Sequence, residues 1–338
     1  MKKNSKVCIM GIYMGKLPNY FSVWLKSCEN NPSVDFIVIT DQSIKNVPEN
    51  VKIINMTLKQ VRARVSEKIG FKAKIDSPFK LCDYKPAYGF VFSDLFIGYD
   101  YWGHCDFDLI WGDLRSFFEK YNLEKYDKFL PMGHLSLYKN TKENNIKFME
   151  KVVGYSDYKK IFTDERNYLF DELALIKIFN KNKNSFFDKI IYADIWPSKR
   201  RYTMCTDLKY YPSIYEEFRK EYNPVNFKNQ IFMWEDKKIF QYYIENEVVK
   251  SREYIYIHIQ KRKWDLEGEF SNKMIISKNK VFTCVDENVK NNINKYNSYS
   301  FIKELYDDVD EFIKHCWSYT KRKILKIEKE RIIVESKI

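Results

Sequence analysis

The stretch Tyr99-Asp-Tyr-Trp-Gly-His-Cys-Asp-Phe-Asp108 decides the fold class, because a mostly apolar run of strand length ends there in two aspartates. Three similar runs come before it, at Val7–Tyr13, Phe36–Thr40 and Lys52–Asn55, and helix-like segments separate most of them. Alternating strands and helices form a parallel sheet that helices cover on both faces. We therefore predict an α/β fold in which ligands bind at the carboxyl ends of the strands.

Three segments have the pattern of helices that cover such a sheet. Apolar residues at helical spacing predict a helix over Leu17–Cys28. Thr57 and Gln60 form a capping-box pattern for a second helix, which ends at Gly70. Leu81–Phe96 is predicted as a third helix, although it contains a proline and a glycine. Farther along, strands are expected at 129–132, 134–138, 238–244 and 254–260, and helices at 146–153, 167–179 and from 301 onward.

The composition fits a folded chain without a membrane span. Of 338 residues, 45% are hydrophobic and 17% aromatic, which excludes global disorder. Apolar runs are too short for a transmembrane helix, and the first of them reads as a strand and not as a signal peptide. Seven scattered cysteines without a C-x-x-C pair argue against a disulfide framework or zinc cluster and predict a cytoplasmic location. No linker divides the chain, so we expect one domain over residues 1–265 and a mainly helical, basic extension over 266–338.

The formal net charge of +12 indicates a partner that carries phosphate. A basic nucleic-acid-binding protein is one alternative, but the chain has no RNP, KH, zinc-finger or helix-turn-helix pattern, so no nucleic acid is expected. Another metal-dependent nucleotide enzyme, such as a nucleotidyltransferase, is a second alternative. The glycines of Gly11-Ile-Tyr-Met-Gly15 are too sparse for the phosphate loop that many such enzymes use.

Asp106 and Asp108 form the D-x-D pair with the most informative context. Carboxylates at positions i and i+2 of an extended segment point the same way, so both can reach one cation. Oxygen ligands suit Mg²⁺ or Mn²⁺, which are commonly shared with substrate phosphates. The alternative is that the pair caps a helix that starts near Asp113. A second pair, Asp308 and Asp310, lies in an acidic stretch and is read as a solvated helix face.

Several blocks of the chain resemble a bacterial glycosyltransferase family that is found in capsule and O-antigen gene clusters and has long been filed as a domain of unknown function. The core of the resemblance is Ser77-Pro-Phe-Lys-Leu-Cys-Asp-Tyr-Lys-Pro-Ala-Tyr-Gly-Phe90 together with the segment from Gly98 to Leu114. Further similar blocks are 11–21 with Trp24, 36–41, 133–140 and 257–263, so that the resemblance covers roughly residues 6–265.

The resemblance implies a GT-A fold, which is a Rossmann-like nucleotide-sugar-binding sheet with a metal-binding D-x-D. The donor half would span about residues 1–130 and the acceptor half about 131–265. The implied enzyme is a metal-dependent hexosyltransferase that moves a sugar from a nucleoside-diphosphate sugar, by analogy UDP-hexose, to a glycan or lipid-linked acceptor in surface polysaccharide synthesis. Mn²⁺ or Mg²⁺ would bind Asp106 and Asp108. His258 would be a third ligand by analogy with some GT-A families, or else an ordinary structural histidine.

The candidates that the resemblance places at the donor are Tyr13, Asp41, Asp83, Lys85, Lys261 and Arg262. Asp83 and Lys85 precede the D-x-D strand, where GT-A enzymes place an acidic and a basic residue, or they are ordinary helix charges. Asp41 would hold the uridine, or would cap a turn. Tyr13 would stack on the base, or would belong to the core. The two basic residues near His258 would contact the diphosphate, or would be solvated.

On the acceptor side, Asp171 and Glu172 are the candidate catalytic residues. One of them would act as general base if the enzyme inverts, although acidic residues also suit a helix N-terminus. His134 would contact acceptor hydroxyls. The basic, partly apolar helix expected near the C-terminus, with Trp317 among its apolar residues, would either lie on an anionic membrane surface or pack as an ordinary helix. The first reading predicts a peripheral location on the inner face of the cell membrane.

Overall fold

A computed structural model describes most of the first 296 residues and three positions beyond them. The described residues are 5–172, 174–180, 185–196, 204, 226–227, 229–260, 265–267, 271–277, 280–284, 286–296, 309, 313 and 317. Lys261, Arg262, the pair Asp308 and Asp310, and most of the segment expected to form the basic C-terminal helix therefore lie outside the described residues. Among the helices of the described part, none is long and apolar enough to cross a membrane.

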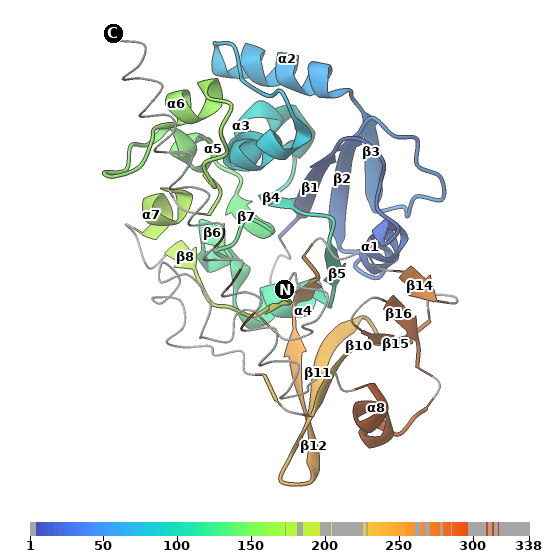
Figure 1. The fold of residues 1–338 in the computed structure, drawn as a ribbon. Coiled ribbons are helices and arrows are strands. Elements are labelled where there is room, and N and C mark those ends of the chain that lie inside the picture. Colours follow the sequence, from blue (N-terminus) through green and yellow to red (C-terminus); the bar gives the residue numbers. More distant parts are fainter. Residues whose placement is uncertain are drawn as a thin grey trace.

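The protein has an α/β fold built on a seven-stranded sheet with the order β3-β2-β1-β4-β7-β6-β8 (Figure 1). Four strands are parallel neighbours: β1 (Val7–Tyr13), β2 (Val34–Thr40), β3 (Val51–Asn55) and β4 (Tyr101–Cys105). This half of the sheet confirms the alternation read from the sequence. Its carboxyl ends carry Asp41 after β2 and Asp106 after β4.

The other half of this sheet is mixed and not parallel. Strand β7 (Leu135–Lys139) runs antiparallel to β4, and β6 (Lys128–Phe129) runs antiparallel to β7. Strand β8 (Phe186–Phe187) then pairs in parallel with β6. Strand β7 therefore extends the sheet beyond β4 through backbone hydrogen bonds. The loop before β7 lies beside the end of β4, where the backbone N–H of Asp106 donates to the backbone oxygen of His134 at 3.0 Å.

Helices lie on both sides of the parallel strands (Figure 1). Helix α1 (Phe21–Glu29) lies on one side, and α2 (Leu58–Ile69) and α3 (Tyr88–Val91) lie on the other. The capping box of α2 is confirmed, because the side chains of Thr57 and Gln60 each accept from the other residue's backbone N–H. The remaining short helices are α4 (Leu114–Lys120), η3 (Leu123–Lys125), α5 (Lys142–Ile146), η4 (Lys147–Met149), α6 (Tyr158–Thr163) and α7 (Ala174–Asn180).

The helix predicted over Leu81–Phe96 is wrong as a single element. The segment consists of a 3₁₀ helix η1 (Pro78–Ala87), the short α3, and a second 3₁₀ helix η2 (Ser93–Phe96). Pro86 has no N–H to donate, so an α-helical ladder cannot pass through it. Three charged side chains of η1, those of Lys80, Asp83 and Lys85, are buried, which bears on the site below.

A second sheet of six strands packs below the first, in the order β12-β11-β10-β15-β16-β14 (Figure 1). Its strands are β10 (Gln230–Glu235), β11 (Lys238–Glu245), β12 (Val248–Tyr254), β14 (Asp265–Glu267), β15 (Lys273–Ile276) and β16 (Lys280–Thr283), and helix α8 (Val289–Tyr296) follows. A boundary at residue 265 would cut through this sheet. The described part of residues 266–338 holds strands as well as helix α8, and one of these strands, β15, pairs directly with β10.

A small third sheet, β5-β13-β9, joins the two larger ones. Strand β5 (Leu109–Trp111) continues from the end of β4, β13 (Tyr256–His258) continues from the end of β12, and β9 (Ala193–Asp194) is the third strand. In the pairing register, His258 lies opposite both Leu109 and Asp194. This junction brings residues that are far apart in the sequence to the end of β4.

Candidate metal and donor site

The D-x-D segment is held by the residue between its two aspartates. Phe107 is buried in an aromatic cluster, with ring centroids 4.9 Å from Trp24, 5.5 Å from Phe21 and 5.7 Å from Tyr13. A Cβ at Gly11 would collide with the Phe107 ring, so only glycine fits there. The burial of Phe107 thus fixes the bend between β4 and the next strand, on which both aspartates lie.

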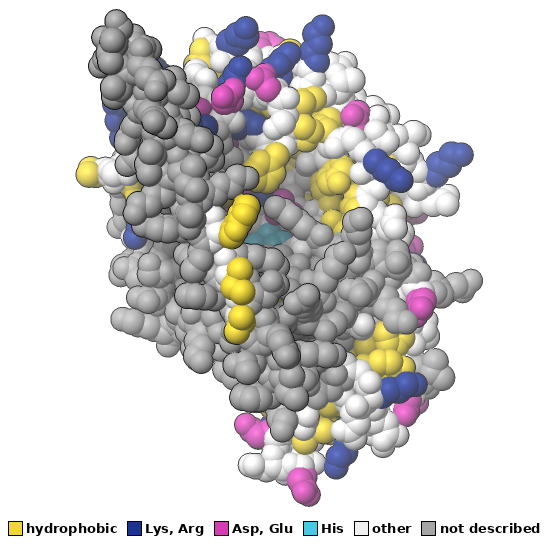
Figure 2. Space-filling view, viewed as in Figure 1, with side chains coloured by type: hydrophobic (Ala, Val, Ile, Leu, Met, Phe, Trp, Pro, Cys, Tyr) yellow, Lys and Arg dark blue, Asp and Glu magenta, His cyan; other side chains and the backbone are white. Residues whose placement is uncertain are grey.

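Asp106, Asp108 and His258 meet at the end of β4. Each offers a ligand atom, and these atoms all lie within 4.8 Å of one another. His258 Nε2 is 3.4 Å from Asp108 Oδ1, and both side chains are only 12% exposed, whereas Asp106 is 36% exposed. On the face seen in Figure 2, histidine and acidic side chains lie within a hollow that apolar side chains border. The structure thus brings together the three residues that the sequence suggested as metal ligands.

These residues fit a divalent cation by the chemistry of their donors. Two carboxylates and one imidazole suit Mn²⁺, and carboxylates suit Mg²⁺. Burial opposes protonation of His258, but the carboxylates of Asp108 and Asp194 overcome it and raise its pKa well above the usual range. A metal-bound imidazole nitrogen carries no proton, so a cation that binds here would displace a proton from His258 and supply the positive charge in its place.

Lys85 connects this group to a second acidic residue. Its Nζ donates to Asp106 Oδ1 at 2.7 Å and to the backbone oxygen of Gly133 at 2.9 Å, and it lies 3.4 Å from Asp171 Oδ2. Burial opposes its charge, but Asp106 and Asp171 hold the pKa of Lys85 well above its usual range. Of the residues predicted at the donor, Lys85 therefore lies within the site and carries a positive charge there.

Asp171 is the more deeply placed of the two predicted catalytic acids. It is 3% exposed, and burial raises its pKa to about 7 although Lys85 opposes the shift. A Cβ at Gly133 would collide with the Asp171 carboxylate and come within 3.1 Å of Glu172 Cγ, so glycine is required for this approach. Glu172 is half-buried beside it. The helix predicted over 167–179 begins only at Ala174, so both acids lie in the loop before it.

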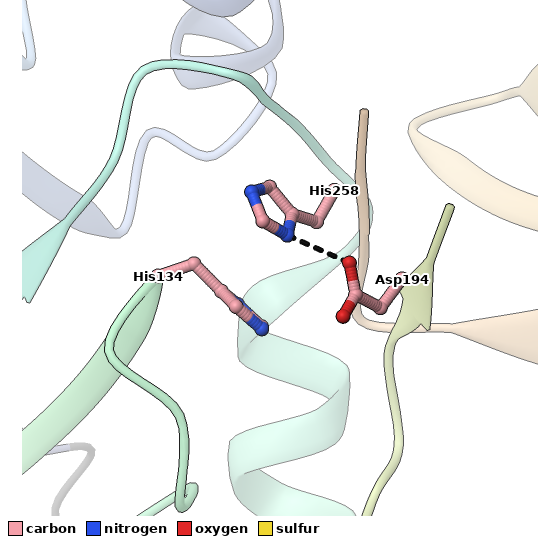
Figure 3. A group of neighbouring side chains, drawn as sticks. All are labelled: His134, Asp194 and His258. Carbon is pink, nitrogen blue, oxygen red and sulfur yellow. Dashed lines mark hydrogen bonds and ion pairs between the residues drawn. The ribbon is translucent and has the colours of Figure 1, made fainter. Parts of the chain in front are cut away.

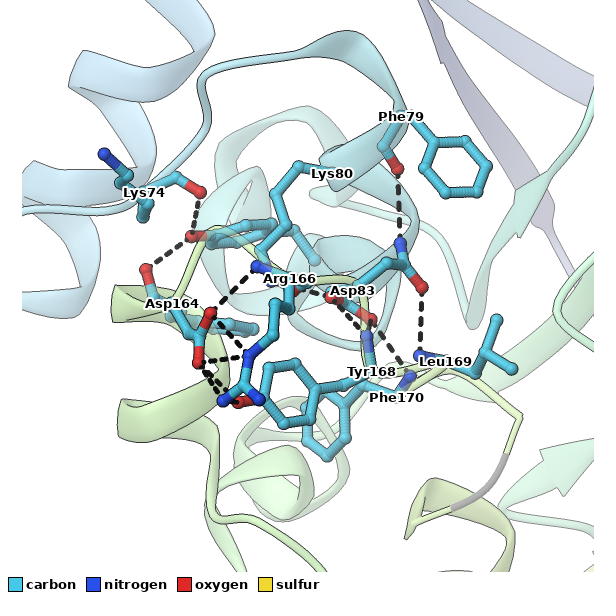
Figure 4. Close-up of polar contacts among 12 residues, drawn as sticks. Lys74, Phe79, Lys80, Asp83, Asp164, Arg166, Tyr168, Leu169 and Phe170 are labelled. Carbon is cyan, nitrogen blue, oxygen red and sulfur yellow. Dashed lines mark hydrogen bonds and ion pairs between the residues drawn. The ribbon is translucent and has the colours of Figure 1, made fainter. Parts of the chain in front are cut away.

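Asp83 holds that loop in place (Figure 4). Its fully buried carboxylate accepts from Lys80 Nζ at 2.8 Å, from the backbone N–H of Tyr168 at 3.0 Å and from that of Phe170 at 3.1 Å. Lys80 also donates to the backbone oxygen of Arg166. These contacts occupy the carboxylate inside the protein, which speaks against the direct donor contact expected from the sequence. They make Asp83 an anchor for the loop that carries Asp171.

Asp41 and Tyr13 lie at the ends of neighbouring strands. Asp41 Oδ1 accepts from the backbone N–H of Gly15 at 2.8 Å and from Gln42 Nε2 at 2.9 Å. These hydrogen bonds, first that of Gln42 and then that of Gly15, lower the pKa of the exposed Asp41 carboxyl. Tyr13 is partly exposed and packs edge-on against Phe107. Both side chains therefore belong to the edge of the sheet where ligands of α/β proteins bind.

His134 lies behind the site and not on its surface. Its ring is 4% exposed, its Nδ1 lies 2.7 Å from the Tyr256 hydroxyl, and it stacks on His258 with centroids 4.3 Å apart. These neighbours cover the ring, so the structure speaks against the acceptor contact expected from the sequence. His134 instead supports one face of His258.

Asp194 is the site residue that the sequence reading missed. Its Oδ1 lies 2.8 Å from His258 Nδ1, and Figure 3 shows the pair beside His134. The signal was present, because Ile190-Ile-Tyr-Ala-Asp194 is an apolar run that ends in an aspartate, the pattern that marked Asp106. Strand β9 is only two residues long, too short for a periodicity to stand out.

A family model described as a family of unknown function, DUF6625, matches residues 9–285. The chain belongs to the DUF6625 family. The matched region holds Asp106, Asp108, Asp194 and His258, and it includes the second sheet through β16, in agreement with a single unit that extends past residue 265. A comparison of this DUF6625 member with curated proteins gives no match.

Solved structures to which the DUF6625 chain is loosely similar are glycosyltransferases. The apo form of mouse xyloside xylosyltransferase 1 has a TM-score of 0.35 and 8% identity, and the match covers 65% of this chain and 96% of that one. The galactosyltransferase LgtC in complex with donor and acceptor sugar analogs has a TM-score of 0.36 and 10% identity, with 65% and 84% covered. The glycosyltransferase GlyE of Streptococcus pneumoniae TIGR4 has a TM-score of 0.29 and 14% identity, with 55% and 45% covered.

Proposed function

We propose that the protein is a metal-dependent glycosyltransferase that moves a hexose from a nucleoside-diphosphate sugar to a glycan or lipid-linked acceptor in bacterial surface polysaccharide synthesis. The observation that carries the proposal is the group formed by Asp106, Asp108 and His258 at the carboxyl end of β4, with the charged pair of Lys85 and Asp171 beside it. A cation site next to a lysine and at a ligand-binding sheet edge suits a diphosphate.

The residues that would hold Mn²⁺ or Mg²⁺ are Asp106, Asp108 and His258. When bound, the ion would act as a Lewis acid that neutralises negative charge on the departing diphosphate. Lys85 is fixed in place by three oxygen partners and adds positive charge without having to reorganise. Lys261 and Arg262, which lie outside the described residues, would add more, because only two or three positions separate them from His258.

The nucleoside would bind along the edge formed by the ends of β1 and β2. There Tyr13 offers an aromatic ring for stacking on a base, and Asp41 offers an exposed carboxylate whose pKa is held below its usual value by hydrogen bonds. A uracil or ribose presents N–H or O–H donors to such an acceptor. UDP is the nucleotide that we propose.

Asp171 is the base that we propose for the acceptor, with Glu172 as the alternative. A general base works best when its pKa is close to the working pH, and burial raises the pKa of Asp171 to about 7. In an inverting reaction, the acceptor hydroxyl would pass its proton to this carboxylate while its oxygen forms a bond to C1 of the sugar. The bond between C1 and the diphosphate oxygen breaks at the same time, and the nucleoside diphosphate leaves with that electron pair.

We also propose a location at the inner face of the cell membrane, where a lipid-linked acceptor would be found. The proposal rests on the basic C-terminal segment, in which Lys321-Arg-Lys323 lies near Trp317. Anionic lipids attract such segments by roughly 1 kcal/mol per basic residue near the surface. Liposome flotation of the full chain and of a chain that lacks residues 314–338 tests this part separately, and equal binding of the two chains would refute it.

The experiment that tests the activity is a thermal-shift series with Mn²⁺, nucleotides and nucleotide sugars. Wild type, Asp108→Ala and the surface control Asp76→Ala are compared. A ligand at one hundred times its dissociation constant stabilises the native state by about 2.7 kcal/mol, which is easily seen as a shift of Tm. We expect UDP or a UDP-sugar to stabilise wild type and the control only with Mn²⁺, and to leave Asp108→Ala unchanged.

Product analysis then separates this function from its alternatives. Release of a nucleoside diphosphate from the stabilising donor supports glycosyl transfer, whereas release of pyrophosphate would identify a nucleotidyltransferase. A folded wild type that no nucleotide stabilises, with or without Mn²⁺, would refute the donor site. Salt-sensitive binding of a generic oligonucleotide at physiological ionic strength would favour a nucleic-acid-binding protein instead.

A further inference from the structure

The two nitrogen atoms of His258 face two different carboxylates. Nδ1 is 2.8 Å from Asp194 Oδ1, the distance of a good hydrogen bond, while Nε2 lies farther, at 3.4 Å, from Asp108 Oδ1. The ring is therefore held through Nδ1. Its other nitrogen is turned toward the D-x-D pair.

The backbone brings Asp194 to this position. Strands β9 and β13 pair in parallel with His258 opposite Asp194, and the backbone N–H of Ile195 donates to the backbone oxygen of His258 at 2.9 Å. A second donor, Gln260 Nε2, reaches the same Asp194 oxygen at 2.6 Å. The carboxylate is thus fixed by its strand and by a neighbouring side chain, and it does not depend on His258 alone for its place.

The ring of His258 is also confined from the side. His134 stacks on it with the two ring planes 29° apart, and the Tyr256 hydroxyl holds His134 through its Nδ1. Figure 3 shows His134 and Asp194 on different sides of His258, and they come from different elements. A rotation that exchanged the two nitrogens of His258 would break the bond to Asp194 within a packed environment.

We propose that Asp194 is a positioning residue that orients His258 and keeps the proton on Nδ1, so that Nε2 is available to a divalent cation shared with Asp106 and Asp108. This inference rests on the metal site of the proposed function. Histidine ligands of metals commonly donate their second N–H to a carboxylate, which fixes the tautomer and raises the basicity of the ligand. Loss of such a partner typically weakens metal binding 10- to 100-fold.

The test measures metal binding directly, without a need for turnover. Mn²⁺ is titrated in the presence of UDP, and free Mn²⁺ is followed by electron paramagnetic resonance, for wild type, Asp194→Ala, Asp194→Asn and the control Asp76→Ala. We expect one ion per chain, a dissociation constant 10- to 100-fold higher for Asp194→Ala, and no change for the control. Asp194→Asn keeps an oxygen acceptor near Nδ1 and should recover part of the affinity, which a general packing role of Asp194 would not predict.

A measurement on wild type keeps the proposal falsifiable if Asp194→Ala does not fold. The chain has four histidines, so ¹⁵N spectra of histidine-labelled protein resolve each ring, and the His258→Gln spectrum assigns His258. With diamagnetic Mg²⁺ and UDP bound, we expect the proton of His258 on Nδ1. A proton on Nε2 instead would overturn the proposal.

The outcomes distinguish this inference from the function on which it rests. If wild type binds Mn²⁺ and Asp108→Ala does not, but Asp194→Ala binds as wild type does, the positioning role is refuted and the metal site stands. If wild type binds no Mn²⁺ with UDP, both fail together. Two ions per chain, the second lost in Asp194→Ala, would show that His134, Asp194 and His258 hold a metal themselves and would also overturn the proposal.

Discussion

At the scale of single residues, Lys85 forms ion pairs with two acidic residues of the site. It is the buried cation between Asp106, which is half-exposed, and Asp171, which is buried. An unpaired buried carboxylate is far more costly than an exposed one, so the two acids depend on Lys85 to different degrees. The protonation state of Asp171 should therefore affect the free energy of unfolding of the whole protein.

The first prediction concerns the pH dependence that Asp171 imposes. Burial raises its pKa to about 7 in the folded state, above its usual value of 3.8, so the folded state binds the proton more tightly than the unfolded state does. Stability therefore falls as the pH rises between about 4 and 7. Asp171→Asn removes this dependence. We expect the variant to gain roughly 2–3 kcal/mol relative to wild type between pH 5 and pH 8, measured by urea unfolding.

A matched surface change controls for general effects of pH on the fold. Asp76→Asn lies at an exposed ion pair with Lys74, and its difference from wild type should stay small over the same range. Parallel pH profiles of wild type and Asp171→Asn would contradict the prediction, because they would show that the Asp171 carboxyl titrates as an ordinary one.

The second residue-scale prediction concerns the glycine beneath the D-x-D segment. Gly11→Ala would push a methyl group against the Phe107 ring, which three other aromatic rings confine. Overpacking of this kind costs about 1–3 kcal/mol. Because Phe107 sits between Asp106 and Asp108, the same displacement should weaken Mn²⁺ binding. The two effects are read from chemical unfolding and from Mn²⁺ titration.

A second substitution tests the cause. Phe107→Leu in the Gly11→Ala background removes part of the ring that the methyl group meets, so the double variant should lose less than the sum of the two single variants. Additive losses would show that the two residues do not interact.

At the scale of elements, the 3₁₀ helix η1 supplies buried charged side chains that position the residues around the site. Its side chains Lys80, Asp83 and Lys85 are all buried, and each contacts the loop over 166–171 or its neighbour Gly133. The sequence showed the charges but not their direction. At 3.0 residues per turn, Lys80 and Asp83 share one side of η1 and pair with each other. Lys85 lies about a third of a turn away, where Asp106 and Gly133 accept from it.

The prediction at this scale is that Asp83 controls the loop that carries Asp171. Asp83→Ala removes the acceptor of the Tyr168 and Phe170 N–H groups and leaves Lys80 buried with the backbone oxygen of Arg166 as its partner. We expect a loss of about 3 kcal/mol in stability and much faster hydrogen exchange at those two amides. Asp83→Asn keeps one acceptor oxygen and should show a smaller loss.

Exchange at a distant amide serves as the control. The N–H of Gly70 closes helix α2 through Ser66 and should exchange as in wild type when the loop alone is loosened. Unchanged protection of the Tyr168 and Phe170 amides in Asp83→Ala would show that Asp83 does not anchor the loop.

At the scale of the whole molecule, a feature could be predicted from the sequence when the residues that form it lie close together along the chain. The parallel strands, the capping box of α2 and the D-x-D pair of Asp106 and Asp108 were predictable, because each has a local pattern, whereas His258 was suggested only by the family resemblance. Asp194 was missed although it ends an apolar run, because its place in the site depends on a partner 64 residues away in the chain. The second sheet was missed for the same reason. Its strands after residue 265 are short and partly polar, and only their pairing with β10 identifies them.

That pairing leads to the last prediction, which concerns the end of the folded unit. A chain that ends at Lys263 would lose β15, whose residues Met274, Ile275 and Ile276 are buried against the middle of the second sheet. It would leave β10 with an unpaired edge and an exposed apolar face, which favours aggregation. Strand β10 also holds Trp234, whose indole N–H donates to the backbone oxygen of Trp111 in β5, so the loss of β15 should also disturb the site.

A chain that ends at Tyr296 retains every strand of this sheet and is the comparison. We expect the shorter chain to be insoluble or to melt at least 10 °C lower than the longer one, because several buried side chains at about 2–5 kcal/mol each are lost together. Equal melting temperatures and equal Mn²⁺ affinity for the two chains would show that residues 1–263 fold alone, and the second sheet would then be an accessory to the site and not its support.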